Sequence, residues 1–340
     1  MNDVLQQAWI KRGALARILW PVAHIYSLII RLRCCLYRFG LLSSERVSVP
    51  VLVVGNVVAG GAGKTPLVIA VTEHLRGKGI HVGVVSRGYG RSGHHVQEVS
   101  FGTPVMEVGD EPLLIKRKTG APVFVAAKRV QAARALLSAY PATQLLVCDD
   151  GLQHYALGRD IEVVVFDNRG VGNGWLLPAG PLREPWPSRP HRKTDLVIHT
   201  GDTPAFEGFT SSKQLADFAL TADGRHVTLS SLLGQPLVAV AAIANPCVFF
   251  AMLEARGLSL RQTISLPDHY DYASYKLPVE ADATVLCTEK DAVKLFAQPA
   301  MASVRLLAVP LQFLPESAFL TTLEVMLAPL LSPLRSTHGH

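Results

Sequence analysis

The sequence predicts an α/β protein with two domains behind an N-terminal helix. From residue 49 onward, short runs rich in β-branched residues alternate with runs of helical periodicity, as in a parallel sheet with helices on both faces. The candidate strands are almost continuously apolar, which is typical of strands buried on both sides of a sheet. The length of 340 residues is about twice that of a typical domain of roughly 150 residues. Hydrophobic residues make up 49% and charged residues 18%, which excludes a disordered chain, a collagen and a coiled-coil rod.

Residues 1–46 carry an excess of positive charge. They contain seven Lys and Arg residues against one Asp and one Glu, and so hold most of the formal net charge of +6. The rest of the chain is nearly neutral, which argues against a nucleic-acid-binding surface. We therefore expect no nucleic-acid partner. The five cysteines form no C-x-x-C pair, which favours a reducing, cytosol-facing compartment.

An amphipathic helix is predicted within this basic segment. Apolar residues recur at steps of three and four from Val22 to Phe39, and Pro21 suits a first helical turn. The longest uncharged stretch of this N-terminal segment, residues 18–30, is shorter than the ~20 residues that cross a bilayer, and no signal-peptide cleavage site follows it. Two interpretations fit the helix: its apolar stripe sinks into an anionic membrane surface, or the stripe packs on the globular core.

A first domain is expected at residues 47–200. Its predicted strands are Val49–Val54, His81–Ser86, Val123–Ala126, Leu145–Cys148, Ile161–Phe166 and Leu196–His199. Its predicted helices are Thr65–Arg76, Glu111–Lys118 and Arg129–Ala139. A long loop rich in Gly, Pro and Trp covers residues 168–193.

A smaller α/β domain is expected at residues 236–331, after a boundary region at 201–235. Its predicted strands are Leu237–Ala242, Thr284–Cys287 and Arg305–Val309. Its predicted helices are Pro246–Ala255, Glu289–Phe296 and Glu316–Leu327. Residues 332–340 are expected to form a flexible tail.

The strongest functional signal is the segment GNVVAGGAGKT at residues 55–65. It follows a predicted strand and opens a predicted helix, which is the setting of a phosphate-binding P-loop and makes the fold P-loop NTPase-like. In such a loop, backbone N–H groups surround phosphate oxygens. Lys64 would contact the β- and γ-phosphates, and the Thr65 hydroxyl would bind Mg²⁺.

Val58 occupies the place of the usual first glycine, and a plain glycine-rich turn is the alternative interpretation. The expected nucleotide-binding residues are Val58, Ala59, Gly60, Gly61, Ala62, Gly63, Lys64 and Thr65.

Two carboxylates end the predicted strand at 145–148. Asp149 and Asp150 stand where further ligands of Mg²⁺ belong in this fold class, and Gln153 follows them closely. A carboxylate that caps a turn is the alternative interpretation for either Asp.

Four more segments carry polar side chains with two interpretations each. Asp110, in GDEP, opens a helix and suits an N-cap. Arg87, in RGYGR, belongs either to a basic loop over phosphate or to a surface turn. Arg183 and Glu184, in LPAGPLRE, suit an acceptor pocket or a packed structural loop. His269, in PDHY, is either a functional or an ordinary loop histidine.

Taken in order, these segments resemble the tetraacyldisaccharide 4′-kinase family of lipid A biosynthesis. The resemblance rests on VGNVVAGGAGKTP, VVSRGYGR, GDEP, DDGLQH, NGWLLPAGPLRE, PDHY and TEKDAVK, which spread over about residues 50–295. The P-loop alone is common to many enzymes, whereas RGYGR, GDEP, DDGLQH and LPAGPLRE in this order are specific.

The resemblance implies an ATP-dependent lipid kinase. Such an enzyme transfers the γ-phosphate of ATP to the 4′-hydroxyl of a membrane-resident tetraacyldisaccharide 1-phosphate and forms lipid IVA. ATP and Mg²⁺ would be its cofactors. It would attach to an anionic membrane surface as a peripheral protein, at the cytoplasmic face of the inner membrane.

The resemblance also implies roles for individual residues. Lys64 and Thr65 match the nucleotide loop, and Asp149 and Asp150 match the acidic pair near the metal. Asp110 and His269 match an acid–base pair at the acceptor hydroxyl; with Lys64 they are the expected catalytic residues. The residues expected to contact the acceptor substrate are Arg87, Gln153, Arg183 and Glu184.

A membrane-associated P-loop ATPase or GTPase switch is the alternative function. Partitioning ATPases carry a lysine directly before the Gly-Gly of the loop, where this chain has Ala59. GTPases carry an Asn-Lys-x-Asp motif, which this chain lacks, because Lys290 and Asp291 are adjacent. Neither class of switch protein accounts for GDEP or LPAGPLRE.

Overall fold

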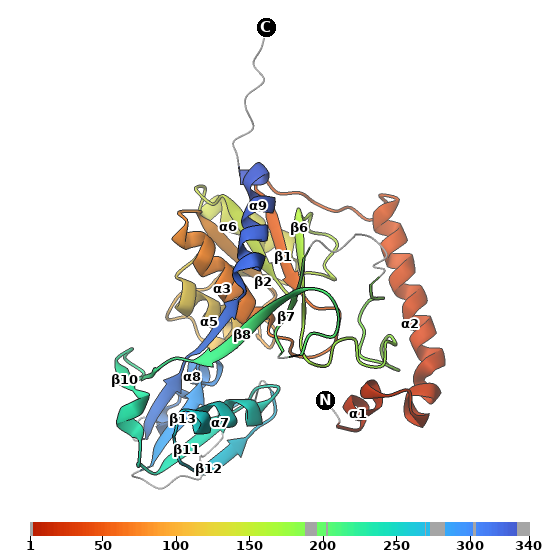
Figure 1. Ribbon diagram of the computed structural model, residues 1–340. Coiled ribbons are helices and arrows are strands. Elements are labelled where there is room, and N and C mark those ends of the chain that lie inside the picture. Colours follow the sequence, from red (N-terminus) through yellow and green to blue (C-terminus); the bar gives the residue numbers. More distant parts are fainter. Residues whose placement is uncertain are drawn as a thin grey trace.

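Two β-sheets organise the chain in the computed structural model, which describes residues 3–187, 196–201, 203–268, 270–272, 283–301 and 304–331. The larger sheet has the strand order β15-β8-β7-β6-β1-β5-β2-β4-β3, and the smaller sheet has the order β10-β9-β14-β13-β11-β12. Each sheet carries its own helices, so that the described chain consists of a large unit and a small unit (Figure 1).

The centre of the larger sheet is parallel from β8 to β4, and only the edge pairs β3–β4 and β8–β15 are antiparallel. Its strands are β1 (Val51–Gly55), β2 (Val82–Ser86), β3 (Gln97–Glu98), β4 (Val123–Val125), β5 (Leu145–Asp149), β6 (Ile161–Phe166), β7 (Leu196–His199), β8 (Phe209–Leu215) and β15 (Leu311–Pro315). The parallel arrangement and the six central strands confirm the fold class expected from the apolar runs.

Helices cover both faces of the larger sheet. Alternate residues of β1 point to opposite sides, so that Leu52 and Val54 enter one core while Val51 and Val53 enter the other. The first core is closed by α3 (Lys64–Gly77), α5 (Asp110–Thr119) and α9 (Ser317–Leu331). The second core is closed by α6 (Arg129–Ala139) and the long loop that follows β6. The short helix α4 (Val105–Val108) precedes α5.

The smaller sheet is parallel from β12 to β14 and antiparallel at β9 and β10. Its strands are β9 (Phe218–Leu220), β10 (His226–Thr228), β11 (Leu237–Ala241), β12 (Leu260–Ser265), β13 (Thr284–Thr288) and β14 (Arg305–Val309). Its α-helices are α7 (Pro246–Ala255) and α8 (Glu289–Leu295), and short 3₁₀ turns lie at Leu229–Leu232 and Pro299–Met301.

The expected domain boundaries are wrong at both ends of the smaller unit. Strand β15 pairs with β8 in the larger sheet, and Phe319 of α9 is fully buried in the core of the large unit. The smaller unit is therefore an insertion between β8 and β15 rather than a separate domain at 236–331. The sequence pattern could not reveal this, because β15 and α9 continue the strand–helix alternation of the smaller unit. The expected tail, residues 332–340, lies outside the described residues.

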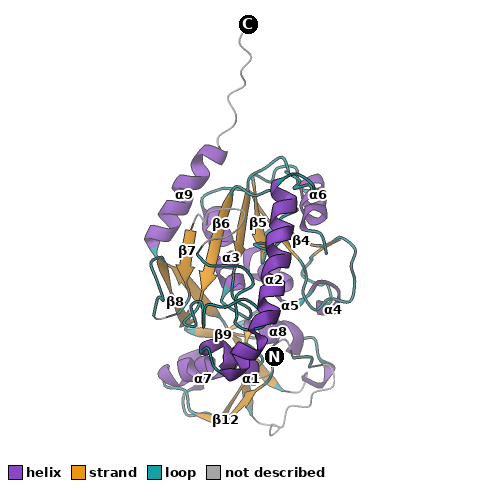
Figure 2. Ribbon diagram, turned by 90° about the vertical axis from the view of Figure 1, so that its right-hand side faces the viewer, coloured by secondary structure: helices purple, strands orange, loops and turns teal. Residues whose placement is uncertain are grey.

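The N-terminal helix begins earlier than expected. Helix α2 (Ala14–Arg38) follows the short helix α1 (Asp3–Ile10), so that Pro21 lies inside α2 and not in its first turn. Figure 2 shows α2 running along the large unit, outside the loops that cover its sheet. The face of α2 toward the protein carries the buried Ala16, Ala23 and Cys34.

The apolar stripe of α2 faces away from the protein. Ile25, Ile29 and Leu32 are each about 60% exposed. The interpretation in which this stripe packs on the globular core is therefore wrong. By length and composition alone α2 could cross a membrane, which is weak evidence for a helix so near the N-terminus.

Candidate active site

The glycine-rich segment forms a P-loop between β1 and α3. Gly63 is the residue before α3 and has a φ of +80°, a conformation that favours glycine. The side chain of Val58 is buried in the second core, and its backbone forms an antiparallel β-bridge with Leu182. Val58 therefore packs against the long loop and anchors the start of the P-loop, which explains an apolar residue at this place.

Lys64 lies at the N-terminus of α3 and turns toward β5. Its Nζ donates to Asn56 Oδ1 at 3.3 Å and lies 3.5 Å from Asp150 Oδ1. Asp150 has a φ of +48° and is the one described residue other than glycine with a positive φ. Left-handed backbone at such a residue costs roughly 1–3 kcal/mol and is found mostly at functional sites. The predicted neighbourhood of Lys64 and Asp150 is thus present.

Asp149 and Asp150 have different surroundings. Burial, with the negative charges of Glu111 and Asp150, raises the pKa of Asp149 to about 7. Asp149 Oδ2 accepts a hydrogen bond from Ser86 at 3.3 Å, while Oδ1 is buried without a hydrogen-bond partner. Burial alone would raise the pKa of Asp150, but Lys64 and other cations outweigh it, and the net shift is downward.

Arg183 and Gln153 both contact the loop region. Arg183 lies 3.5 Å from Asp150 through Nη1, and its backbone N–H donates to the carbonyl of Val57 at 2.7 Å. Gln153 donates to the carbonyl of Asn56 at 3.2 Å. These two predicted substrate contacts therefore lie beside the P-loop.

Helix α2 reaches this site through Tyr26. The Tyr26 hydroxyl donates to the carbonyl of Arg183 at 3.2 Å. Glu184 is buried, and its charge is one cause that raises the pKa of Tyr26, after burial. Helix α2 thus lies beside the site.

Positive charge gathers around His154, next to the Asp pair. Burial and neighbouring arginines lower the pKa of His154 to about 4, so that its ring is neutral at pH 7. Its Nε2 accepts a hydrogen bond from the backbone of Arg129 at 3.2 Å. Arg87 is exposed at the end of β2 and contributes to this field. The arginines concerned are Arg33, Arg87, Arg129 and Arg159.

Asp110 opens α5 and is almost completely buried, at 4% exposure. Its Oδ2 lies 3.2 Å from Lys294 Nζ on α8, and the neighbouring Glu111 lies 3.6 Å from Lys290 Nζ. The small unit therefore supplies two lysines to the start of α5, next to the carboxylate of Asp149.

His269, the expected partner of Asp110, lies outside the described residues. The residues on either side contact the same two lysines. Asp268 Oδ1 lies 3.1 Å from Lys290 Nζ, and the carbonyl of Tyr270 accepts from Lys294 at 3.1 Å.

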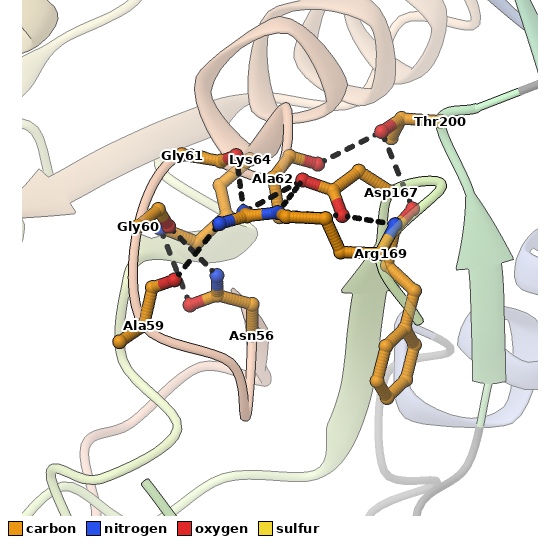
Figure 3. A network of polar contacts seen from close by, with 10 residues as sticks. Asn56, Ala59, Gly60, Gly61, Ala62, Lys64, Asp167, Arg169 and Thr200 are labelled. Atoms are coloured by element: carbon orange, nitrogen blue, oxygen red, sulfur yellow. Dashed lines mark hydrogen bonds and ion pairs between the residues drawn. The ribbon is translucent and has the colours of Figure 1, made fainter. Parts of the chain in front are cut away.

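Several residues around the P-loop were not predicted from the sequence. Arg169 and Thr200, which follow β6 and β7, bind carbonyl groups of the loop, and Asp167 binds Arg169 (Figure 3). Arg129 donates to the carbonyl of Asp150 at 3.1 Å from the start of α6. Each follows a parallel strand at its carboxyl end, where such strands converge on one edge of the sheet. That convergence was the available signal, but which strand ends lie beside the P-loop depends on strand order, which the sequence does not show.

The small unit also touches the P-loop directly. A Cβ placed on Gly61 would lie 3.4 Å from Cβ of Ala244, which follows β11. The P-loop and the small unit are therefore close neighbours.

The residues present fit a magnesium ion. The described part of the chain contains no group of three or more His, Cys, Asp and Glu side chains arranged around one point. Magnesium keeps several waters and needs only one or two carboxylates besides phosphate oxygens. The buried Asp149, which has an unpartnered oxygen and lies within the electrostatic reach of Lys64 in the P-loop, meets that need.

Comparison with known proteins agrees with this site. The family model described as tetraacyldisaccharide-1-P 4'-kinase matches residues 15–328. A tetraacyldisaccharide 4'-kinase of Polaromonas naphthalenivorans is 64% identical over 340 residues, which cover 100% of this chain and 99% of that protein. A tetraacyldisaccharide 4'-kinase of Acidovorax sp. strain JS42 is 56% identical over 342 residues, which cover 100% of this chain and 97% of that protein.

A solved structure has the same fold. The "apo" form of LpxK from Aquifex aeolicus, in complex with ATP, has a TM-score of 0.79 and 28% sequence identity, and the match covers 93% of this chain and 99% of that chain. The switch-protein alternative is not favoured by these matches. The chain belongs to the tetraacyldisaccharide-1-P 4'-kinase family.

Proposed function

We propose that this chain is an ATP-dependent lipid kinase, which transfers the γ-phosphate of ATP to the 4′-hydroxyl of a tetraacyldisaccharide 1-phosphate and forms lipid IVA. The observation that carries the proposal is the P-loop lysine Lys64 facing Asp150, beside the unpartnered carboxylate oxygen of Asp149. Phosphoryl transfer needs positioning and charge stabilisation more than covalent help from the protein, and this arrangement suits that need.

Each side chain has a defined task in the proposed reaction. The P-loop N–H groups and Lys64 bind the β- and γ-phosphates, while Asp149, Asp150 and Thr65 are the proposed ligands of Mg²⁺. Mg²⁺, when bound, neutralises charge on the phosphate oxygens. The 4′-oxygen attacks the γ-phosphorus, the bond to the β–γ bridging oxygen breaks, and ADP leaves. Asp110 takes the proton of the attacking hydroxyl.

Lys294 holds Asp110 in place from the small unit. We propose that His269 completes the acid–base pair with Asp110. The contacts of Asp268 and Tyr270 with the two lysines at α5 support this pairing.

The charge distribution suits the acceptor. The arginines around His154 form a positive field that attracts a sugar 1-phosphate, and Arg183 adds a further positive charge beside Asp150. Arg87, Gln153, Arg183 and Glu184 are the proposed contacts of the disaccharide.

The outer face of α2 suits a membrane surface. Ile25 and Ile29 are exposed, and tetraacylated lipids do not leave the bilayer because each buried CH₂ contributes ~0.8 kcal/mol to membrane attachment. The contact between Tyr26 and Arg183, which joins α2 to the site, supports this proposal. We propose peripheral attachment at the cytoplasmic face of the inner membrane, with α2 lying in the interface.

A direct assay tests the proposed function. Purified protein is incubated with Mg²⁺, γ-labelled ATP and the disaccharide 1-phosphate in detergent, and the lipid is examined for label. We expect label at the 4′ position, and Lys64→Ala should lower the rate ~10²–10³-fold, the usual loss of one charge-stabilising contact. Absence of labelled lipid, or undiminished transfer by Lys64→Ala, would disprove the proposal.

A further inference from the structure

Four successive carbonyl groups of the P-loop each accept a hydrogen bond from a side chain (Figure 3). Arg169 Nη1 donates to Ala59 O at 3.3 Å, and Arg169 Nη2 donates to Gly61 O at 3.0 Å. The carbonyls between and after them are bound by other residues: Asn56 Nδ2 donates to Gly60 O at 3.1 Å, and Thr200 Oγ1 donates to Ala62 O at 3.0 Å.

These bonds fix the directions of the loop N–H groups. A trans peptide is planar, so that the N–H of one residue points opposite to the carbonyl of the residue before it. Arg169 binds the carbonyls of Ala59 and Gly61 from one side, and the N–H groups of Gly60 and Ala62 therefore point to the other side. Backbone N–H groups are the atoms through which a P-loop binds phosphate.

Arg169 is itself held rigidly. Its Nε donates to Asp167 Oδ1 at 3.1 Å and its Nη2 donates to Asp167 Oδ2 at 2.7 Å, a side-on pair in which a planar guanidinium matches both oxygens of a carboxylate. A lysine cannot form this fork and bind two carbonyls at once. The space is tight, since a Cβ on Gly60 would lie 3.0 Å from Arg169 Nη1.

We propose that Arg169, held by Asp167, is a positioning residue for the nucleotide: it acts through the P-loop backbone and sets the loop N–H groups for the phosphates. The inference rests on the proposed nucleotide site but not on the identity of the phosphate acceptor. Because it acts through the loop and not on the γ-phosphate, its loss should weaken ADP and ATP alike.

Calorimetric titration of the full-length protein with Mg-ADP and with a non-hydrolysable Mg-ATP analogue tests the proposal. We expect Arg169→Ala to raise the Kd of both nucleotides about tenfold and Arg169→Lys to raise both by less. In the lipid assay, Arg169→Ala should raise KM for ATP and leave KM for the lipid unchanged. The matched control is Arg225→Ala, because Arg225 forms the same Asp-x-Arg pair with Asp223 on the exposed surface of the small unit.

The outcomes separate the possible roles of Arg169. Unchanged Kd values for Arg169→Ala would overturn the proposal, and so would a loss confined to the ATP analogue, which would indicate direct contact with the γ-phosphate. If Arg169→Ala does not fold, Asp167→Asn keeps the arginine but loosens it, and we then expect a smaller rise of both Kd values; no rise overturns the proposal. If Arg169→Ala weakens ADP binding but the wild-type protein phosphorylates no lipid, the proposed function is refuted and the proposed role of Arg169 still holds.

Discussion

Asp149 and Asp150 are neighbours in the chain, yet they are suited to different tasks. The pKa of Asp149 is raised to about 7, chiefly by burial, whereas Lys64 and Arg183 keep Asp150 ionised. Asp150 is therefore a permanent anion that orients two cations. Burial makes the ionised form of Asp149 unfavourable until a cation neutralises its charge. This favours Asp149 over Asp150 as the direct ligand of Mg²⁺.

This difference predicts a pH dependence of magnesium binding. Only the ionised carboxylate binds the metal, so Mg²⁺ affinity should rise up to about tenfold per pH unit below pH 7 and level off above it. Titration of the protein with Mg²⁺ and ADP between pH 5.5 and 8.5 measures this. Asp149→Asn should bind Mg²⁺ weakly and lose this pH dependence, and a wild-type profile that is flat from pH 5.5 would contradict the assignment.

The same shift predicts a change in stability without metal. The pKa of Asp149 is 3.8 in the unfolded chain and about 7 in the folded one. The neutral carboxyl therefore contributes to the free energy of unfolding fully below pH 3.8, and this contribution is lost as pH rises through 7. At pH 8, Asp149→Asn should therefore raise the metal-free Tm by a few °C, since ~1 kcal/mol corresponds to about 2–4 °C. Thermal unfolding at pH 8 and pH 4 checks this, and an equal gain at both pH values would exclude an origin in ionisation.

Asp110 and His269 are expected to act as one unit. Asp110→Ala and His269→Ala should each lower turnover, and the double variant should be little slower than the slower single variant, because either loss disables the same proton transfer. Steady-state kinetics of the three variants with lipid in detergent measure this. Fully additive losses would indicate separate roles.

The sequence revealed the residues of the site that belong to recognisable local patterns. Lys64 and Asp150 were predicted to lie together because a P-loop and the end of a neighbouring parallel strand meet at one edge of a sheet. Arg169 and Thr200 were not predicted, because no local pattern shows that β6 and β7 lie on the other side of β1. Their role depends on strand order, which a single sequence does not specify.

At the scale of elements, α2 has two apolar faces, and only one of them packs on the protein. Ala16, Ala23 and Cys34 let the helix approach the large unit closely, and the outer face keeps Ile25 and Ile29 in solvent. The sequence showed one apolar stripe along the helix. It did not show which face of the helix would pack on the large unit. The small residues of the inner face were the missed signal.

Charging the outer face should detach the protein from membranes. The double variant Ile25→Glu and Ile29→Glu should lower binding to anionic vesicles at least about tenfold, since burial of one such side chain contributes ~1.5–3 kcal/mol. Vesicle co-sedimentation measures this, and activity on lipid in detergent should stay unchanged. Val248→Glu and Val325→Glu, at exposed sites of α7 and α9, serve as controls. Wild-type sedimentation of the α2 variant would show that attachment lies elsewhere.

At the scale of the molecule, the small unit is joined to the large unit by two adjacent connections. The backbone N–H of Ala216, after β8, donates to the carbonyl of Pro310, before β15, at 2.9 Å. Leu215 and Leu311 are register partners in the antiparallel pair that closes the larger sheet. The sequence could not show this, because the partners lie at opposite ends of the inserted segment.

The insertion should therefore be removable. Replacing residues 216–310 with Asn-Gly joins β8 to β15 by a tight hairpin turn, for which this dipeptide is favoured. We expect a folded large unit with a lower Tm, since Lys294 and its contact with Asp110 are gone, with ADP affinity within about threefold of the full chain and no lipid kinase activity. Circular dichroism and calorimetry measure this. The same excision with Lys64→Ala should not bind ADP, and failure of the first variant to fold would show that the units are interdependent.

The return of the chain to the larger sheet also sets an order for biosynthesis. Strand β15 and helix α9 leave the ribosome after the small unit. The edge of β8 therefore stays unpaired, and the apolar residues that Phe319 covers stay exposed, until residues 311–331 have been made. The small unit, whose strands are contiguous in the chain, can fold before the nucleotide-binding unit is complete. Premature termination before residue 311 would spare the small unit and leave the phosphate-binding half of the enzyme unfinished, although its P-loop was translated first.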